Sequence, residues 1–347
     1  MENFFIEYRD PMFGIIVLFA IVFIISFANY WWGVFKSKEE KDSIEKFVKR
    51  FEIVTDENEY KKLLEDFNIP LESLALLAGA YAKSGDYEKA INIYIVALKR
   101  VKGKSEKQYL LSTLGKTYFK AGFLRRASDV FLESLRLHPR NEESLKYLMV
   151  VYETLKEYDK AEEVLDSLEE LGVKVTLQKS YLGVLSVMQD RTLKDKEKIA
   201  KLLKMVENIP FLKRKVFEFM QATRYEMSKE FFNSLDYEAI VDLLWFMDNE
   251  WFDISTCKDN LVQEIAMAKE LTPYILHPQA KFEFDVIARF KSQGWDDLTL
   301  NFEYMCSECK QVFPIHFYRC PACQAINSVK IQPLLAQKNN EENIPFL

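Results

Sequence analysis

Apolar and small residues recur at fixed spacing through the middle of the chain. Leu74, Leu111 and Leu145 occupy equivalent places, which gives steps of 37 (111 − 74) and 34 (145 − 111) residues. Within each copy the apolar positions fall three and four residues apart, which predicts amphipathic helices. We therefore expect three pairs of helices between residues 71 and 172.

The repeated positions are those of a tetratricopeptide repeat. Small residues let two antiparallel helices approach closely, and aromatic residues fill the space between successive pairs. A series of such pairs typically binds a peptide or another protein. The copies read Leu74, Leu77, Ala78, Tyr81, Gly85, Tyr87, Ala90, Tyr94 and Ala97, then Leu111, Leu114, Gly115, Tyr118, Gly122, Leu124, Ala127, Phe131 and Pro139, then Leu145, Leu148, Tyr152, Tyr158, Ala161 and Leu165.

The pattern weakens beyond Gly172. Residues 198–206, 213–220 and 237–247 are still predicted to be helical. We interpret this part as degenerate helical hairpins that continue the repeats; a separate helical domain is the alternative. Helix boundaries are expected at Pro210, Pro273 and Pro278.

An uncharged segment near the N-terminus, residues 11–35, is long enough to cross a bilayer once. Tyr30, Trp31 and Trp32 fall where an aromatic belt would meet the headgroups. A cleaved signal peptide is the rival interpretation, but the acidic start of the chain does not favour it. Lysine and arginine follow the segment and only Arg9 precedes it, which predicts a cytoplasmic C-terminal side.

The next segment, residues 36–70, combines many charges with one apolar stripe. Ile44, Phe47, Val48, Phe51 and Val54 recur at helical spacing. The stripe could pack on the first repeat or extend the anchor. Alternatively, it could form a helix on the membrane surface or against a partner.

Composition supports a folded, mainly helical chain. Of 347 residues, 49% are hydrophobic and 29% charged, and only 10 are glycine and 10 proline. The net charge of −6 argues weakly against a nucleic-acid-binding protein, which usually has a basic excess.

Four of the five cysteines form two Cys-x-x-Cys pairs near the C-terminus. Cys306 and Cys309 precede Cys320 and Cys323 by ten intervening residues. Two such turns can direct four sulfurs to one tetrahedral ion, so we predict a single Zn²⁺ or iron site. A pair of disulfides is the alternative, and the cytoplasmic placement does not favour it.

Other candidate chemistry is weak. Gly115-Lys116-Thr117 resembles the end of a phosphate-binding loop, but Leu110 replaces the glycine that the motif requires. The three histidines show no zinc-protease spacing, although His316 could replace a cysteine as a ligand. We expect Cys257 to be a buried apolar residue in a helix. The protein is therefore predicted not to be an enzyme, and no catalytic residue is assigned. The histidines are His138, His277 and His316.

Four lysines are expected on the inward surface of the first helices. A basic wall there would favour an acidic ligand; the alternative is that these lysines only keep the surface soluble. They are Lys83, Lys116, Lys120 and Lys146.

The order of these parts resembles the lipopolysaccharide assembly protein B family. The likeness is most specific at Tyr304-Met-Cys306-Ser-Glu-Cys309 and at Tyr318-Arg-Cys320-Pro-Ala-Cys323 followed by Ser328-Val-Lys330. The resemblance implies a rubredoxin-like metal-binding ribbon. Where the family usually has glycine after the first pair, this chain has Lys310, which would cost about 1 kcal/mol if the turn needs a positive φ.

The resemblance also implies a role at the cell inner membrane. The family controls the amount of lipopolysaccharide by helping the membrane protease FtsH degrade the deacetylase LpxC. It is also thought to gather lipopolysaccharide assembly components. These partners are expectations from the resemblance; the spacing of the repeats does not identify them.

We therefore predict a mostly α-helical scaffold or adaptor with a single transmembrane helix and a small C-terminal ribbon. The alternatives are a rubredoxin-like electron-transfer protein, a nucleic-acid-binding ribbon and a general membrane-tethered scaffold for other clients. Self-association is left open. The expected parts are a periplasmic N-terminus (1–10), the anchor (11–35), the juxtamembrane segment (36–70), repeats and degenerate hairpins (71–299), the ribbon (300–335) and a tail (336–347).

Overall fold

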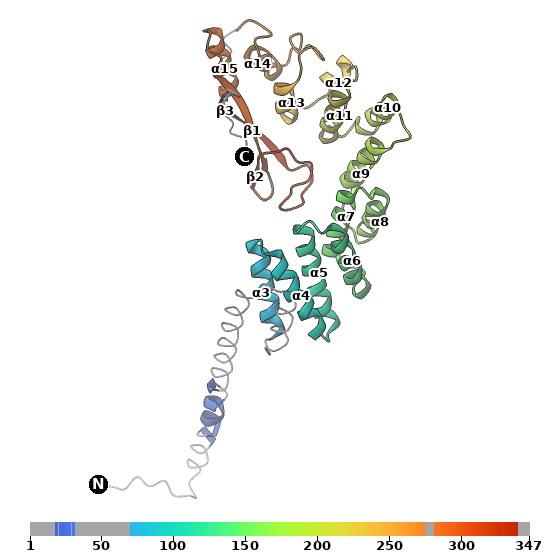
Figure 1. Ribbon diagram of the computed structural model, residues 1–347, viewed down its shortest axis with the longest axis vertical. Helices are drawn as coiled ribbons and strands as arrows, with labels where there is room; N and C mark the ends of the chain where they lie inside the picture. The colour runs from blue at the N-terminus through green and yellow to red at the C-terminus, as the bar shows by residue number, and fades with distance from the viewer. Residues whose placement is uncertain (1–17, 20, 29, 32–69, 275–280, 339–347) are drawn as a thin grey trace, which may run out of the picture. The chain divides into compact units, whose positions relative to one another are not determined.

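The computed structural model describes residues 18, 19, 21–28, 30, 31, 70–274 and 281–338. The chain divides into two compact units, residues 1–151 and 152–347, and each is considered by itself. The described residues are mostly helical and end in one small sheet (Figure 1), as the composition predicted.

The first unit contains the first two predicted repeats as antiparallel helix pairs (Figure 1). The division between the units falls inside the third pair, whose first helix starts in unit 1. The buried positions include Leu74, Ala78 and Ala90, which the repeat pattern assigned to the core. The pairs are α3 (Leu71–Ser84) with α4 (Tyr87–Arg100), α5 (Lys104–Lys120) with α6 (Leu124–Leu137), and α7 (Glu142–Leu155) with α8 (Tyr158–Glu170).

The turn inside each pair has the same backbone geometry. Gly85 and Gly122 have φ values of 88° and 80°, in the left-handed region that favours glycine. In the third pair the equivalent residue is Lys156, with φ of 63°. The repeat therefore keeps its turn even where the chain lacks the glycine that suits it.

Gly115 in α5 is required by close helix packing. A Cβ atom added there would lie 2.7 Å from Cε1 of Phe131, whose side chain is fully buried in α6. This explains Gly115 as a packing residue, in line with the rejection of a nucleotide-binding loop.

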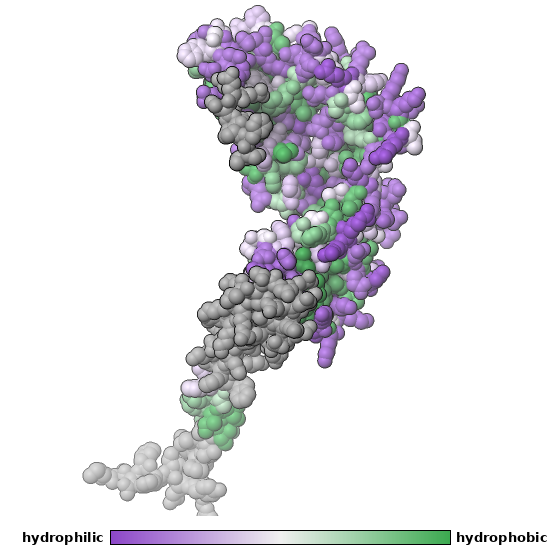
Figure 2. Space-filling model, viewed as in Figure 1, coloured by the Kyte–Doolittle hydropathy of each residue, from purple (hydrophilic) through white to green (hydrophobic). Residues whose placement is uncertain are grey.

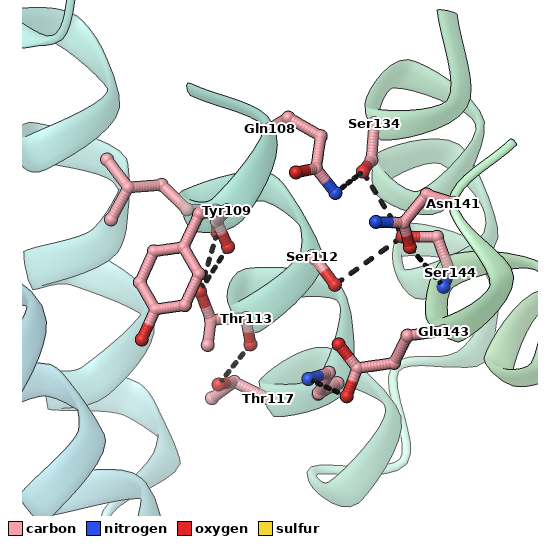
Figure 3. A network of polar contacts seen from close by, with 11 residues as sticks. Gln108, Tyr109, Ser112, Thr113, Thr117, Ser134, Asn141, Glu143 and Ser144 are labelled. Atoms are coloured by element: carbon pink, nitrogen blue, oxygen red, sulfur yellow. Dashed lines mark hydrogen bonds and ion pairs between the residues drawn. The ribbon is translucent and has the colours of Figure 1, made fainter. Parts of the chain in front are cut away.

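A buried polar network joins α5, α6 and α7 (Figure 3). The Ser134 and Ser144 hydroxyls lie 3.2 Å apart, and Ser144 Oγ donates to Ser112 Oγ at 3.4 Å. Asn141 accepts from the Ser144 N–H at 2.7 Å. Small hydroxyl side chains here let the helices approach and still satisfy their own polar atoms.

The second unit departs from regular repeats. Residues 238–246 are helical as predicted, as a 3₁₀ turn followed directly by a short α-helix. Pro210 begins α11 as predicted, Pro273 lies between α14 and α15, and Pro278 lies outside the described residues. The elements after α8 are α9 (Thr176–Gln189), α10 (Asp195–Val206), α11 (Pro210–Thr223), α12 (Lys229–Asn233), η1 (Glu238–Ile240), α13 (Val241–Phe246), α14 (Asn260–Ala268) and α15 (Phe282–Ser292).

The ribbon is a three-stranded antiparallel sheet in the order β2-β1-β3. β1 (Leu298–Cys306) pairs along its whole length with β3 (Val329–Gln337) and only briefly with β2 (Val312–Phe313). β1 therefore begins two residues before, and β3 ends two residues after, the predicted bounds of the ribbon (300–335). Alternate β1 residues, including Leu300, Phe302 and Tyr304, are buried, so one face of the sheet joins the core of the second unit.

The described N-terminal residues are helical and apolar (Figure 2). Leu18, Phe23 and Trp31 are among the exposed large side chains. Most of the predicted anchor (11–35) and nearly all of the juxtamembrane segment (36–70) lie outside the described residues, as do the termini at 1–10 and 339–347. Among the residues that the structure does describe, no helix reaches the length and apolarity needed to cross a membrane.

Candidate metal centre

The two cysteine pairs form matching turns in the ribbon. The Cys306 N–H donates to Gln311 O at 2.9 Å, and the Lys310 N–H donates to Cys306 O at 2.9 Å. In the second turn the Cys320 N–H donates to Ala325 O at 2.8 Å, and the Gln324 N–H donates to Cys320 O at 2.9 Å. Each turn thereby directs its two sulfurs toward the other.

The four sulfurs gather at one point. Their Sγ atoms lie within 4.8 Å of one another; Cys306 and Cys323 are 3.7 Å apart, and Cys309 and Cys320 are 3.6 Å apart. An ideal tetrahedron with metal–sulfur bonds of about 2.3 Å has edges of about 3.8 Å. A disulfide requires about 2.05 Å, and all four thiols are free. The geometry fits one Zn²⁺ or iron ion; which metal binds stays a prediction.

Exposure and hydrogen bonding differ between the sulfurs. Cys306 and Cys320 are buried, Cys309 is half-buried and Cys323 is exposed. Burial raises the pKa of Cys306, but its hydrogen bond with the Ser328 hydroxyl and those from the Cys309 and Glu308 backbone outweigh this effect and lower the pKa to about 6. Although the Cys323 residue is exposed, desolvation of its thiol and hydrogen bonds with the other three cysteine side chains raise its pKa to about 12. A bound ion would hold all four as thiolates, releasing protons as it binds.

The backbone at Lys310 has a positive φ, the turn geometry for which the resembling family usually has glycine. Its φ is 62°, and Gln324 at the equivalent place in the second turn has φ of 64°. The Lys310 ammonium also donates to Ser307 O at 2.6 Å. Both turns therefore place a residue with a side chain where glycine would fit without strain.

Tyr318, two residues before a metal-site cysteine, anchors the ribbon on the helices. It stacks on Tyr181 of α9 at 5.9 Å and meets Phe211 of α11 edge-on at 5.6 Å. The Lys215 ammonium lies over its ring at 4.4 Å. The second turn is thus joined directly to the core of the second unit.

Arg319 makes the longest-range ion pair of the ribbon. Its guanidinium contacts both carboxylate oxygens of Glu153, at the end of α7, at 2.6–3.1 Å. Both side chains are at most 10% exposed. This engagement leaves Arg319 poorly placed to bind nucleic acid, which weakens the nucleic-acid alternative.

A buried charge network ties β1 to α11 and α13. Arg214 donates to both carboxylate oxygens of Asp242 at 2.6 and 2.8 Å, and the Tyr304 hydroxyl donates to the same carboxylate at 2.8 Å. Burial raises the pKa of Asp242, but Arg214 and Tyr304 outweigh it, and the pKa is lowered overall.

The aromatic residues around the cysteine turns pack against one another. Phe313 meets Phe317 edge-on at 5.2 Å, and His316 meets Tyr304 and Tyr318 edge-on at 5.4 and 4.9 Å. Burial and Arg214 lower the pKa of His316 to about 3, so its ring is neutral. His316 does not belong to the sulfur cluster, so the four cysteines alone form it.

Cys257 differs from its prediction. It lies in a turn before α14, is only half-buried, and its thiol donates to the Tyr237 hydroxyl at 3.7 Å. Asp259 caps α14 two residues later, so the helix starts after Cys257. His138 follows α6 as expected, and His277 lies outside the described residues.

The predicted basic surface of the first helices carries less positive charge than its four lysines suggested. Lys116 pairs with Glu143 and lies over the Tyr147 ring, and Lys146 pairs with Glu142 at 2.5 Å. Since carboxylates neutralise two of the four predicted lysines, this surface carries less positive charge than expected.

Comparison with known proteins supports the repeats. Residues 73–108 match the tetratricopeptide repeat family model. No curated protein matches the chain.

Similar solved structures include a tetratricopeptide repeat protein from Parabacteroides merdae. It has 15% identity and a TM-score of 0.35, over 73% of this chain and 99% of that one. A double mutant of MamA RS-1 has 18% identity and a TM-score of 0.36, over 47% and 91%. PilF of Pseudomonas aeruginosa has 19% identity and a TM-score of 0.31, over 48% and 72%.

Sequence reasoning missed the residues that hold the ribbon on the helices. Glu153, Arg214 and Asp242 are ordinary charged residues within helical patterns, and their partners lie 28 to 166 residues away. Their spacing in the sequence carries no signal of the pairing.

Proposed function

We propose that this protein is a non-enzymatic adaptor that binds a client protein through its helix pairs. The observation that carries the proposal is the helix pair within residues 73–108, which matches the tetratricopeptide repeat model and is followed by two more pairs of the same design. Stacked pairs present extended surfaces that repeat proteins use to bind other proteins.

The proposal places this adaptor at the cell inner membrane. The uncharged segment 11–35 and the basic residues after it favour a single-pass anchor with a periplasmic N-terminus and a cytoplasmic C-terminal bulk. Tethering raises the effective concentration of two bound proteins without tight contacts. Reporter fusions at residue 5 and after residue 338 test the topology: periplasmic activity of the second fusion would overturn it.

The resemblance to the lipopolysaccharide assembly protein B family suggests the pathway. In this proposal the adaptor promotes degradation of LpxC by FtsH and so limits lipopolysaccharide synthesis. Depletion in the native organism should raise both LpxC and lipopolysaccharide. Unchanged amounts of both would show that this protein does not act in that pathway, and the proposal would then be a scaffold for other clients.

The ribbon is proposed to hold a structural ion in the Cys306, Cys309, Cys320 and Cys323 site. About 30 residues bury too little surface to fold securely alone, and a structural ion supplies that energy. Because Cys323 is exposed, electron transfer through an iron site is the second candidate. Metal analysis with an absorption spectrum separates them: colourless zinc protein excludes the redox role.

A further inference from the structure

A groove runs along the outer edge of β3 in the second unit. Its volume is about 620 Å³, and it lies between β3 and the start of α11. The strand side is formed by Val329 and Ile331, and the opposite side by Leu177, Ile209, Phe211 and Asp236. The metal centre and its docking contacts do not account for this groove.

The β3 edge presents main-chain hydrogen-bonding groups to this groove. The Ser307 N–H donates to Ser328 O and the Lys338 N–H to Asp297 O, so β3 residues with even numbers face β1. Bonding alternates along an antiparallel strand. The N–H and C=O groups of Val329 and Ile331 therefore point away from β1, about 6.6 Å apart. No group of the described residues bonds them.

The same edge is blocked immediately beyond the groove. Pro333 is the next outward-facing residue, and it has no N–H to donate. Proline is one of the devices that protect an exposed edge from pairing with another strand. The unprotected portion of the edge is thus limited to Val329–Ile331, which is the portion that lines the groove.

The size and charge of the groove select its occupant. A second copy would have to bring a whole sheet edge between β3 and α11, whereas two outward residues suit a short extended segment. The far wall is apolar at Leu177 and Phe211. The charged lining is mixed: Glu238 pairs with Lys281 and Lys330 adds a cation, whereas Asp236 makes no ion pair among the described residues. A basic side chain would therefore complement the groove only beside Asp236.

We propose that this groove binds a short extended segment of a partner protein, which adds as a strand to Val329–Ile331. The segment places an apolar side chain against Phe211 and a lysine or arginine beside Asp236. This inference rests on the proposed adaptor function and gives that function a second contact site, separate from the regular repeats.

The test is selection of decapeptides from a random phage-displayed library on the full-length protein in a mild detergent. Enriched peptides are then synthesised, and their affinities are measured by fluorescence anisotropy. Ile331→Pro deletes the outward N–H and leaves the β1 ladder intact, so it should weaken binding about five- to tenfold. Leu335→Pro deletes an outward N–H outside the groove and should leave affinity unchanged.

Further variants test whether the peptides bind in the groove or on the helix pairs. Asp236→Asn should weaken binding of the basic peptides and reduce its salt dependence. If the Ile331→Pro protein binds the peptides with the same affinity as the unchanged protein, or if the library yields no enriched peptide, the proposed binding site in the groove is wrong. A dimer that light scattering shows to be lost in Ile331→Pro would assign the edge to a second copy instead. If the peptides lose binding only to the Tyr109→Ala protein, with its change on α5, the adaptor function would stand and the groove would not be their binding site.

Discussion

The regular repeats and the ribbon-bearing unit are stabilised in different ways. The repeats join helices that are neighbours in the sequence through small residues, as at Gly115 and Phe131. The second unit instead joins distant segments through buried charges, as in Arg319 with Glu153 and Tyr304 with Asp242. Local packing repeats along a chain, whereas buried ion pairs specify single contacts at a high desolvation cost. We therefore expect the two regions to respond differently to the same perturbation.

The largest difference should follow loss of the metal site. Cys306→Ser removes a buried ligand of the proposed ion, which would contribute on the order of 10 kcal/mol to folding. The ribbon should unfold and lose its metal while α3–α6 stay helical. Hydrogen exchange resolved by segment, with metal analysis, measures both. Cys257→Ser is the matched control and should change neither; a protected ribbon in the Cys306→Ser protein would contradict a structural ion.

Breaking the buried charge network should be the next largest effect. Asp242→Asn leaves the Arg214 charge without its buried partner, which costs about 3–5 kcal/mol. Tyr304→Phe removes one hydrogen bond to the carboxylate and should cost about 1.5–3 kcal/mol. Urea unfolding followed by segment-resolved exchange should localise both losses to the second unit. Equal destabilisation of α3–α6 would show that the two regions are not independent.

The same network predicts a pH dependence. The pKa of Asp242 is lower in the folded chain than in the unfolded chain. Its contribution is therefore present above about pH 4, the unfolded value, and is lost as pH falls through the folded pKa. Unfolding free energies between pH 6 and pH 3 should fall less steeply in Asp242→Asn. An identical slope in both proteins would contradict the lowered pKa of Asp242 and assign the acid sensitivity to other groups.

Overpacking tests the repeats themselves. Gly115→Ala places a methyl group against the Phe131 ring and should destabilise the first unit by about 1–3 kcal/mol. Thermal unfolding with exchange on α5 and α6 measures the loss. Gly79→Ala is the matched control, because its nearest contact would be an ordinary 3.7 Å to the Tyr94 hydroxyl. A cost at Gly79 equal to that at Gly115 would contradict the packing explanation.

The smallest effects are gains, and they should occur at a repeat turn and at a metal-site turn. Lys156→Gly and Lys310→Gly relieve a positive φ and should each stabilise by up to about 1 kcal/mol. Lys156→Gly acts on a repeat turn, and Lys310→Gly on a metal-site turn, where it should also slow metal loss to a chelator. A lower midpoint in either variant would mean that the lysine side chain contributes more than the strain costs.

The repeats and the cysteine site were predictable because their signals are local. Leu74, Leu111 and Leu145 mark a period, and the two cysteine pairs carry their own geometry. The positive φ at Lys310 was a condition raised by the family resemblance, and the structure meets it. The contacts of Arg319 and Arg214 were not predictable. The local sequence around a charged residue is the same whether its side chain is solvated by water or paired with a distant carboxylate. The helical pattern at 237–247 was correct, but it did not show that the segment is a 3₁₀ turn followed by a short α-helix.

The pairing of Glu153 with Arg319 has a consequence for synthesis of the chain. The two residues are separated by 166 positions. At roughly 5–20 residues per second, Glu153 leaves the ribosome about ten to thirty seconds before its partner exists. During that interval α7 ends in a carboxylate that only water can solvate, and Tyr181 and Phe211 lack the Tyr318 ring that later packs on both of them. Completion of the second unit is therefore a late event in translation, and a nascent chain stalled before the ribbon would expose the surfaces that chaperones and proteases recognise.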